Sequence, residues 1–314
     1  MLRESSSVYD VLGLGCTAVD DVLFVPSYPA MDAKTRVVSR KRQFGGLTGT
    51  ALVTASRLGA RCAYAGCLGT DEASTWIADR FRDEGIEISA APRLKEAAVV
   101  QSTIIVAEDT GLRSVFYSCE GMIGAHPAEP PEDILRATKV LFLDHYGMRG
   151  NLRAARIARA SGIGVVADFE DATDPLFPEL LALVDHLILS AEMAGRITGC
   201  TEPAAAARLL WREDRAAVVI TCGADGCWSL SAAHPAEPCH HLAFTVKAVD
   251  TNGCGDVFHG AYAAGLARGL DLPRRLRLAA AAAALKAAQA LIPSMAAIKD
   301  FLLGQPESAG TSPL

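Results

Sequence analysis

Hydrophobic and polar positions follow two different periods along most of this chain. Short apolar, β-branched runs of the kind found in buried strands are separated by longer segments in which apolar residues recur every three or four positions, as on one face of a helix. This alternation predicts an α/β fold, with a doubly wound, mostly parallel sheet flanked by helices. Strands are expected at 8–15, 63–66, 140–143, 164–168, 186–189 and 217–221, and helices at 48–58, 74–84, 151–161, 177–184, 191–198 and 203–213.

Two stretches depart from this rhythm. Residues 18–44 and 97–119 alternate polar and apolar positions around turns at "PSYPAMD" and "EDTGLR", which is typical of hairpins with one solvated face. We expect them to form a small antiparallel β lid on a single domain that spans 1–314. The C-terminal residues 304–314 have the composition of a disordered tail.

The composition narrows the function classes. Half of the 314 residues are hydrophobic, enough for a sizeable core, and the formal net charge of −6 gives no reason to expect a nucleic-acid partner. No apolar run approaches the roughly 18 to 20 residues that cross a bilayer. The nine cysteines stand singly, so neither a disulfide framework nor a zinc site is favoured. We therefore expect a soluble, cytoplasmic protein with no membrane partner.

An early glycine motif tests one nucleotide-binding hypothesis. The stretch "GLGCTA" at 13–18 follows a predicted strand and matches the dinucleotide fingerprint G-x-G-x-x-A. That fingerprint requires a helix directly afterwards, so that the helix N-terminus faces the pyrophosphate. The β-branched run "VDDVLFVPSYP" follows instead. The sequence therefore does not favour a dehydrogenase.

A second glycine motif has the helix that the first one lacks. In "VDTNGCGDVFHGAYAAGLARG", residues 249–269, Gly253, Cys254 and Gly255 precede an Ala-rich helical run. Backbone N–H groups in such a turn, with the positive helix end, can hold a phosphoryl group in transfer. Asp256, kept ionised by the helix start, is placed to accept a proton from an attacking hydroxyl. The alternative is that Asp256 only caps the helix.

Several motifs together resemble one family. The run "DTNGCGD" is similar to the second signature of the PfkB, or ribokinase-like, carbohydrate kinases, and "FGGLTGTALVTASRLGA" at 44–60 is similar to the first. The resemblance extends over about 9–301. Within the family, "DVFHGA", "AALK" and Thr50 most resemble the sulfofructose kinase branch. The resemblance implies a ribokinase-like fold and transfer of the γ-phosphoryl group of Mg-ATP to a primary hydroxyl of a small sugar or sugar derivative.

The resemblance also assigns residues to these roles. Asp256 would be the general base, and Gly253, Cys254 and Gly255 would form the anion hole. The substrate would lie against Asp20, Gly45, Gly46 and Thr50, although the sequence leaves open whether Asp20 or its neighbour Asp21 faces it. ATP would contact Ser190 and, in the turn of "VVITCGADGCWSL", Thr221, Gly223 and Gly226.

Two positions depart from the family pattern. In "LSAEMAGRITG" the acid expected to organise Mg²⁺ through water is Glu192, displaced by one residue, and such a shift rotates a helical side chain by about 100°. After Lys286 the family usually has a Gly-rich loop that helps to bind a monovalent cation, whereas this chain reads "AAQALIPSM". A monovalent cation is therefore not predicted.

The acceptor is the least determined feature. Lys34 and Arg113, on the expected lid strands, would suit an anionic head group, or they are solvent-facing strand residues. His145 and Tyr146 would suit sugar hydroxyls. The alternatives are a nucleoside kinase, with a base stacked on lid aromatics (Phe24, Tyr28, Phe116 and Tyr117), and a non-catalytic sugar- or nucleotide-binding sensor. The resemblance is compatible with a homodimer that pairs through the lid.

Overall fold

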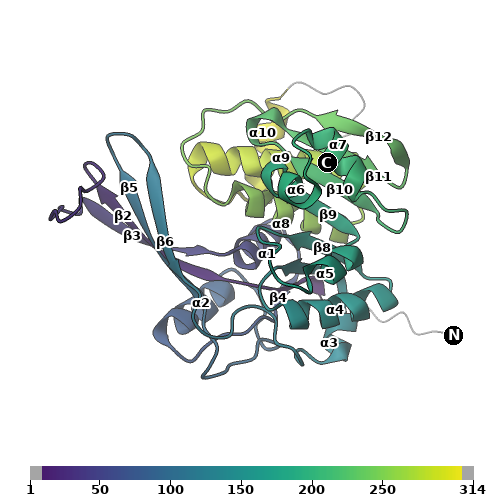
Figure 1. Ribbon diagram of the computed structural model, residues 1–314, viewed down its shortest axis with the longest axis horizontal. Coiled ribbons are helices and arrows are strands. Elements are labelled where there is room, and N and C mark those ends of the chain that lie inside the picture. Colours follow the sequence, from purple (N-terminus) through teal and green to yellow (C-terminus); the bar gives the residue numbers. More distant parts are fainter. Residues whose placement is uncertain (1–8, 306–314) are drawn as a thin grey trace.

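The computed structural model describes residues 9–305, and its core is an eight-stranded sheet (Figure 1). The strand order is β12-β11-β10-β9-β8-β7-β1-β4. From β4 to β10 neighbouring strands are parallel, and β11 and β12 add an antiparallel edge. The strands are β1 (Tyr9–Leu14), β4 (Cys62–Tyr64), β7 (Thr138–Asp144), β8 (Gly164–Asp168), β9 (His186–Ser190), β10 (Ala217–Thr221), β11 (Cys227–Ser231) and β12 (His234–His241). The predicted doubly wound α/β fold is confirmed.

Helices cover both faces of this sheet because its strands are apolar on both sides. Along β1, Val11 packs into one core and Leu12 into the other, and the same alternation recurs in the neighbouring strands. One core includes α1 (Leu47–Arg57), α2 (Glu72–Asp83), α8 (Cys254–Ala267), α9 (Leu272–Gln289) and α10 (Met295–Leu303). The other includes α3 (Glu132–Arg136), α4 (Met148–Ala160), α5 (Phe177–Leu183), α6 (Ala191–Thr198) and α7 (Pro203–Leu210).

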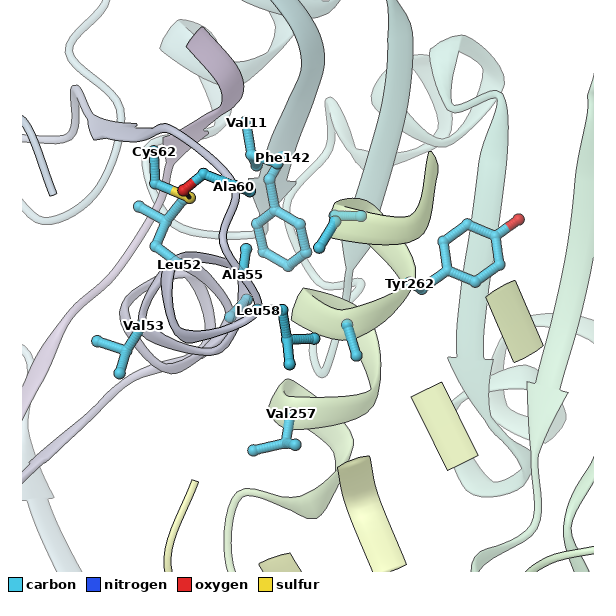
Figure 2. Close-up of a cluster of buried hydrophobic side chains, with 14 of the residues drawn as sticks. Val11, Leu52, Val53, Ala55, Leu58, Ala60, Cys62, Phe142, Val257 and Tyr262 are labelled. Carbon is cyan, nitrogen blue, oxygen red and sulfur yellow. Dashed lines mark hydrogen bonds between the residues drawn. The ribbon is translucent and has the colours of Figure 1, made fainter. Parts of the chain in front are cut away.

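The first core joins the two helices that matter most for the site. Phe142 of β7 belongs to the same cluster as Leu52 of α1 and Val257 of α8 (Figure 2). The two helices approach so closely that a Cβ at Gly260 of α8 would lie 2.2 Å from the carbonyl oxygen of Ala51. A glycine at this crossing therefore sets the separation of α1 and α8, and both helices begin at the cavity described below.

The lid is a separate four-stranded sheet that projects from the core (Figure 1). Its order is β3-β2-β5-β6, with β2 (Ala18–Val25), β3 (Ser39–Gly45), β5 (Val100–Ala107) and β6 (Arg113–Ser118). The β2–β3 and β5–β6 pairs are antiparallel hairpins, as predicted. The two hairpins join through β2 and β5, which are parallel because both run outward from the core. Hairpin patterns alone do not determine that central pairing.

Element ends differ from the predictions where side-chain caps decide them. Helix α2 begins at Glu72, before the predicted 74, because the Asp71 carboxylate accepts the N–H of Ser74 at 2.8 Å. Helix α7 ends at Leu210 rather than at 213. Within 9–305, no helix is long and apolar enough to cross a membrane. Most of the predicted disordered tail, 306–314, lies outside the described residues.

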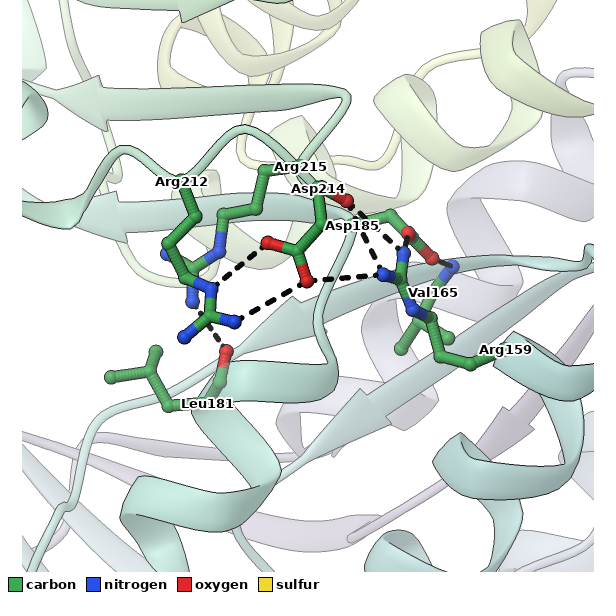
Figure 3. Close-up of polar contacts among 7 residues, drawn as sticks. All are labelled: Arg159, Val165, Leu181, Asp185, Arg212, Asp214 and Arg215. Carbon is green, nitrogen blue, oxygen red and sulfur yellow. Dashed lines mark hydrogen bonds and ion pairs between the residues drawn. The ribbon is translucent and has the colours of Figure 1, made fainter.

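Charged side chains gather at the amino edge of the parallel strands, where β8, β9 and β10 begin (Figure 3). Arg159 contacts both Asp185 and Asp214, and Arg212 donates to Asp214 at 2.9 Å. Asp185 also accepts the backbone N–H of Val165 at 2.9 Å. These charges are paired with one another and with the main chain, so they tie the strand starts together.

Candidate active site

A cavity of about 780 Å³ lies between the lid and the ends of several core elements. Its wall includes the inner lid face, the starts of α1 and α8, the end of α9 and the loop after β8. This is the carboxyl edge of the parallel strands, where open α/β sheets bind ligands. Of the predicted catalytic and substrate residues, those in the wall are Asp20, Gly45, Gly46, Thr50, Arg113, Gly253, Gly255 and Asp256.

The start of α8 has the backbone geometry of an anion site. Gly253 is the N-cap and has φ +71°, a left-handed conformation that favours glycine. A Cβ at Gly255 would meet no atom within 4 Å, so the turn is open at this residue, which lines the cavity. The first N–H groups of a helix have no partner inside the helix, although in this turn the N–H of the predicted Cys254 donates to the carbonyl oxygen of Thr251 at 3.4 Å. An incoming phosphoryl group can therefore approach the main chain directly.

Asp256 lies in the first turn of α8 and is half-buried in the cavity wall. Because the N-cap is a glycine and makes no side-chain capping bond, helix capping does not account for Asp256. Burial raises the pKa of Asp256, and the nearby carboxylates of Asp168 and Glu170 raise it further. The helix start was predicted to keep Asp256 ionised, whereas burial and the neighbouring carboxylates favour its protonated form. A raised pKa makes the carboxylate a better proton acceptor.

Acidic and imidazole groups lie behind this residue. The Asp168 carboxylate ends β8 and is 3.2 Å from Nδ1 of His259 on α8. The two ring nitrogens of His259 lie 2.8 Å from the carbonyl oxygen of Gly255 and 3.1 Å from that of Ile188. This buried histidine thus joins the start of α8 to β8 and β9. Glu170 was not among the predicted residues, although its position shortly after a buried strand is a sequence signal for a site at the carboxyl edge of the sheet.

The lid structure shows which of the adjacent acids Asp20 and Asp21 faces the cavity, a question that the sequence left open. Asp20 is 7% exposed and lines the cavity, whereas Asp21 points to the other face and forms a bidentate pair with Arg42 at 2.8 and 2.9 Å. Successive strand residues face opposite sides of a sheet, so only one of the two can face the substrate. One oxygen of Asp20 accepts the hydroxyl of Ser102. Burial raises the pKa of Asp20, and that hydrogen bond partly offsets the rise.

A row of polar side chains crosses the inner lid face at the level of Asp20. The strand register pairs Gln43 with Asp20, Asp20 with Ser102, and Ser102 with Tyr117, so the four side chains share one face. All four line the cavity. An amide, a carboxylate, a hydroxyl and a phenol side by side suit an acceptor with several hydroxyl groups. Gln43 and Ser102 could not be predicted from the sequence because their register with Asp20 is a tertiary property.

The predicted glycines and Thr50 are placed by close contacts at the start of α1. A Cβ at Gly45 would lie 2.4 Å from Oδ2 of Asp20, so glycine leaves room for that carboxylate. Gly46 has φ +87° and a Cβ there would meet the main chain of Thr17 at 2.6 Å. Thr50 is buried one turn into α1, and its methyl group would be 3.9 Å from a Cβ at Gly253. The starts of α1 and α8 therefore face each other across the cavity floor.

One buried carboxylate connects the loops around this floor. Asp144, at the end of β7, accepts the N–H of Cys16 at 2.7 Å, the hydroxyl of Thr48 at 2.8 Å and the N–H of Tyr146 at 2.8 Å. Burial raises the pKa of Asp144, while its hydrogen-bond donors favour the ionised form. His145 and Tyr146 line the cavity. Asp144 therefore holds the ends of β1 and β7 and the start of α1 in one arrangement.

The two basic residues predicted for the acceptor are separated by the fold. Arg113 begins β6 and lines the cavity, but Lys34 lies in the exposed loop between β2 and β3 and not on a lid strand. The prediction for the position of Lys34 is therefore wrong. Lys41 of β3 lines the cavity instead, because it alternates in phase with Gln43. The sequence cluster "RVVSRKR" contains Lys41 but does not show which of its cations faces inward.

The predicted ATP residues lie further along the carboxyl edge of the sheet, outside the cavity wall. Ser190 and Thr221 end the adjacent strands β9 and β10 and are direct partners in the register. The turn after β10 contains Gly223 and Gly226, with φ +59° and +87°. A Cβ at Gly226 would lie 1.9 Å from the carbonyl oxygen of His241, so packing against β12 by itself requires this glycine.

Glu192 is not brought to the site. Its side chain is 84% exposed on the first turn of α6 and lies 4.0 Å from Arg196. The displacement by one residue turns the carboxylate to solvent. Glu170, which lines the cavity with Asp256, is the acid that the fold places nearby.

Comparisons with known proteins identify the family. The model of the pfkB family of carbohydrate kinases matches residues 11–291. Ribokinase from Haemophilus influenzae is 27% identical over 303 residues, covering 92% of this chain and 97% of that protein. Among solved structures, a ribokinase from Thermotoga maritima has a TM-score of 0.82 at 21% identity and covers 94% of this chain and 100% of its own. Ribokinase from Arabidopsis thaliana, complexed with ribose and ATP, has a TM-score of 0.81 at 20% identity, with 94% and 98% covered; at these identities the structures show the fold alone. The chain belongs to the PfkB family of carbohydrate kinases.

Proposed function

We propose that this enzyme transfers the γ-phosphoryl group of Mg-ATP to a primary hydroxyl group of a small sugar or sugar derivative. The observation that carries the proposal is that Asp256, the open N-terminal turn of α8 and the polar lid row around Asp20 all line one cavity. A proton acceptor, an anion site and a polyol-binding surface are the three parts that this reaction needs.

The reaction is a displacement at phosphorus. The acceptor hydroxyl is held near Asp20, and its oxygen forms a bond to the γ-phosphorus while the bond to the β,γ-bridging oxygen breaks. Asp256 accepts the hydroxyl proton, and ADP leaves. The N–H groups at Gly253, Cys254 and Gly255 stabilise the charge on the transferred group without reorganisation. Closure of the lid over the acceptor would exclude water as a competing nucleophile.

The acidic residues of the cavity fit a magnesium ion that arrives with ATP. Magnesium prefers oxygen ligands and is usually held by one or two carboxylates together with substrate phosphates. Glu170, which lines the cavity, would hold it from the protein side and would leave Asp256 free to accept the proton. When bound, the ion neutralises charge on the phosphates. Contacts of ATP with Ser190, Thr221, Gly223 and Gly226 remain part of this proposal.

The polar row on the lid supports an acceptor rich in hydroxyl groups. Whether this acceptor also carries a negative charge is the point to test. Lys41 and Arg113 would face an anionic head group, whereas the row around Asp20 would serve any acceptor rich in hydroxyl groups. The nucleoside alternative has one supporting observation. Of the four lid aromatics considered, Tyr117 lines the cavity and offers a stacking face for a base.

The test is ADP release from Mg-ATP with a panel of ketoses, aldoses, sugar acids, sulfo-sugars and nucleosides. We expect activity with one class of acceptor and a loss of about 10²- to 10⁴-fold in kcat for Asp256→Asn, with ATP affinity retained. Turnover near the wild-type rate in Asp256→Asn would remove the assignment of the base. ATP binding without turnover on any acceptor would favour the sensor.

A further inference from the structure

A buried lysine lies in the cavity wall next to the anion-binding turn. Lys286 is in the last turn of α9, and its side chain is only 10% exposed. Lysine is rarely buried unless its ammonium group is paired. Its Nζ is 2.8 Å from Oδ2 of Asp250, a residue of the loop that leads into α8. The last turn of α9 is therefore tied by charge to the loop that precedes the proposed phosphoryl site.

The carboxylate of Asp250 also accepts a hydrogen bond from the main chain next to the turn. While Oδ2 of Asp250 accepts from Lys286, Oδ1 accepts the backbone N–H of Asn252 at 2.9 Å. Asn252 directly precedes Gly253, the N-cap of α8. Burial by itself would raise the pKa of Asp250, but the hydrogen bonds from Lys286 and Asn252 outweigh burial and the pKa is lowered. The carboxylate is thus held ionised between the ammonium group and the turn.

Main-chain bonds join the same two segments. The N–H groups of Val249 and Asp250 both donate to the carbonyl oxygen of Ala287, at 2.7 and 3.0 Å. Just beyond, Ala290 ends α9 in a left-handed conformation with φ 55°. The main chain therefore fixes where the loop begins, and the ion pair fixes how its carboxylate faces the turn.

We propose that Lys286 is a positioning residue whose ammonium group acts as a covalently attached monovalent cation. Through Asp250 it holds the 250–253 loop in the conformation in which the N–H groups of the α8 turn face the cavity. Its positive charge also lies on the side of the cavity where the phosphates of ATP would enter. This second role rests on the proposed kinase function. A small free cation can take over this role when the side chain is removed, because it fits the space that the ammonium group occupied.

Cation rescue of Lys286→Ala tests the proposal. We expect wild-type kcat to be insensitive to K⁺, NH₄⁺ and methylammonium, and the variant to lose about tenfold or more in kcat, the scale of a lost charge-assisted hydrogen bond. Added NH₄⁺ or methylammonium should restore a large part of the rate, while tetramethylammonium, which is too large, should not. The acceptor KM should change little, since the lid row is untouched. Lys299→Ala, an exposed lysine on α10, is the matched control and should behave like wild type.

Hydrogen exchange gives a readout that does not depend on turnover. We expect faster exchange in peptides covering 249–256 for Lys286→Ala, and protection restored by NH₄⁺. Asp250→Asn should show the same loss without rescue, because it removes the carboxylate that the cation needs. Lys286→Met keeps the apolar stem and tests the charge alone if the Ala variant does not fold.

The outcomes separate the two proposals. Loss of rate and protection that no cation restores would assign Lys286 an ordinary packing role and overturn the inference, as would unchanged exchange in both Lys286 variants. A wild-type protein that turns over no acceptor, yet shows cation-reversible exchange in Lys286→Ala, would overturn the kinase function while keeping the role of Lys286.

Discussion

Replacing Gly260 with alanine should separate the two helices that form the floor of the site. The added Cβ would lie 2.2 Å from the carbonyl oxygen of Ala51 and 2.8 Å from its carbonyl carbon. These are main-chain atoms inside α1, so no side-chain rotation can remove the overlap. Helix α8 must therefore move away from α1 by about 1 Å to reach normal van der Waals contact.

The consequence for activity follows from where the overlap occurs. Gly260 is one turn beyond Asp256 on α8, and Ala51 is next to Thr50 on α1. A shift of about 1 Å at the crossing therefore changes the separation of the proposed base from the acceptor side of the cavity. Misplacement of that size can cost about 10²-fold in rate. Overpacking a well-packed core also destabilises by about 1 to 3 kcal/mol.

Steady-state kinetics and thermal unfolding measure both effects. We expect Gly260→Ala to lower kcat/KM by about 10²-fold and to lower Tm. The matched control is Gly195→Ala in α6, where a Cβ would meet only the carbonyl oxygen of Cys200, at 3.4 Å. The control should keep its activity and gain a little stability, since alanine favours helix. Wild-type kcat/KM and Tm in Gly260→Ala would refute the reasoning.

Two further predictions concern the acids of the cavity. Because burial and then Asp168 raise the pKa of Asp256, the acidic limb of the pH profile of kcat/KM should lie above the ordinary aspartate range. Asp168→Asn removes one negative charge and should move this acidic limb to lower pH. A limb that stays in place or moves to higher pH would contradict the electrostatic assignment. Ser102→Ala removes the donor to Asp20 and should raise the acceptor KM about fivefold, whereas Asp21→Ala, on the outer lid face, should leave the acceptor KM unchanged. Equal changes of KM in the two variants would contradict the assignment of Asp20 as the acid that faces the acceptor.

Much of the fold could be predicted from local patterns. The six strands of the parallel sheet and the two lid hairpins follow from apolar runs, alternation and turn residues, which act between neighbours in the chain. The parallel joining of β2 and β5 could not be predicted, since it depends on where both hairpins leave the core. The start of α2 depends on the Asp71 cap, which a periodicity count overlooks.

The site was predicted in part for a comparable reason. Gly253, Gly255 and Asp256 could be proposed from the sequence and do line the cavity, because they are contiguous in the chain. Lys34 was misplaced because the alternating pattern extended the lid strands over a segment that forms the loop between β2 and β3. Lys286 and Asp250 lie 36 positions apart, so their contact leaves no local signal.

The sequence by itself therefore determined the element types, the glycine turn at the start of α8 and the family, because these depend on short-range periodicity and on contiguous motifs. Only the tertiary structure decided which charges meet. It turned Asp20 inward and Asp21 outward, brought Glu170 rather than Glu192 to the cavity, and placed the ammonium group of Lys286 on Asp250. The physical reason is that strand register, helix crossing and burial are set by packing between distant segments, and these three properties control both the position and the pKa of each ionisable group.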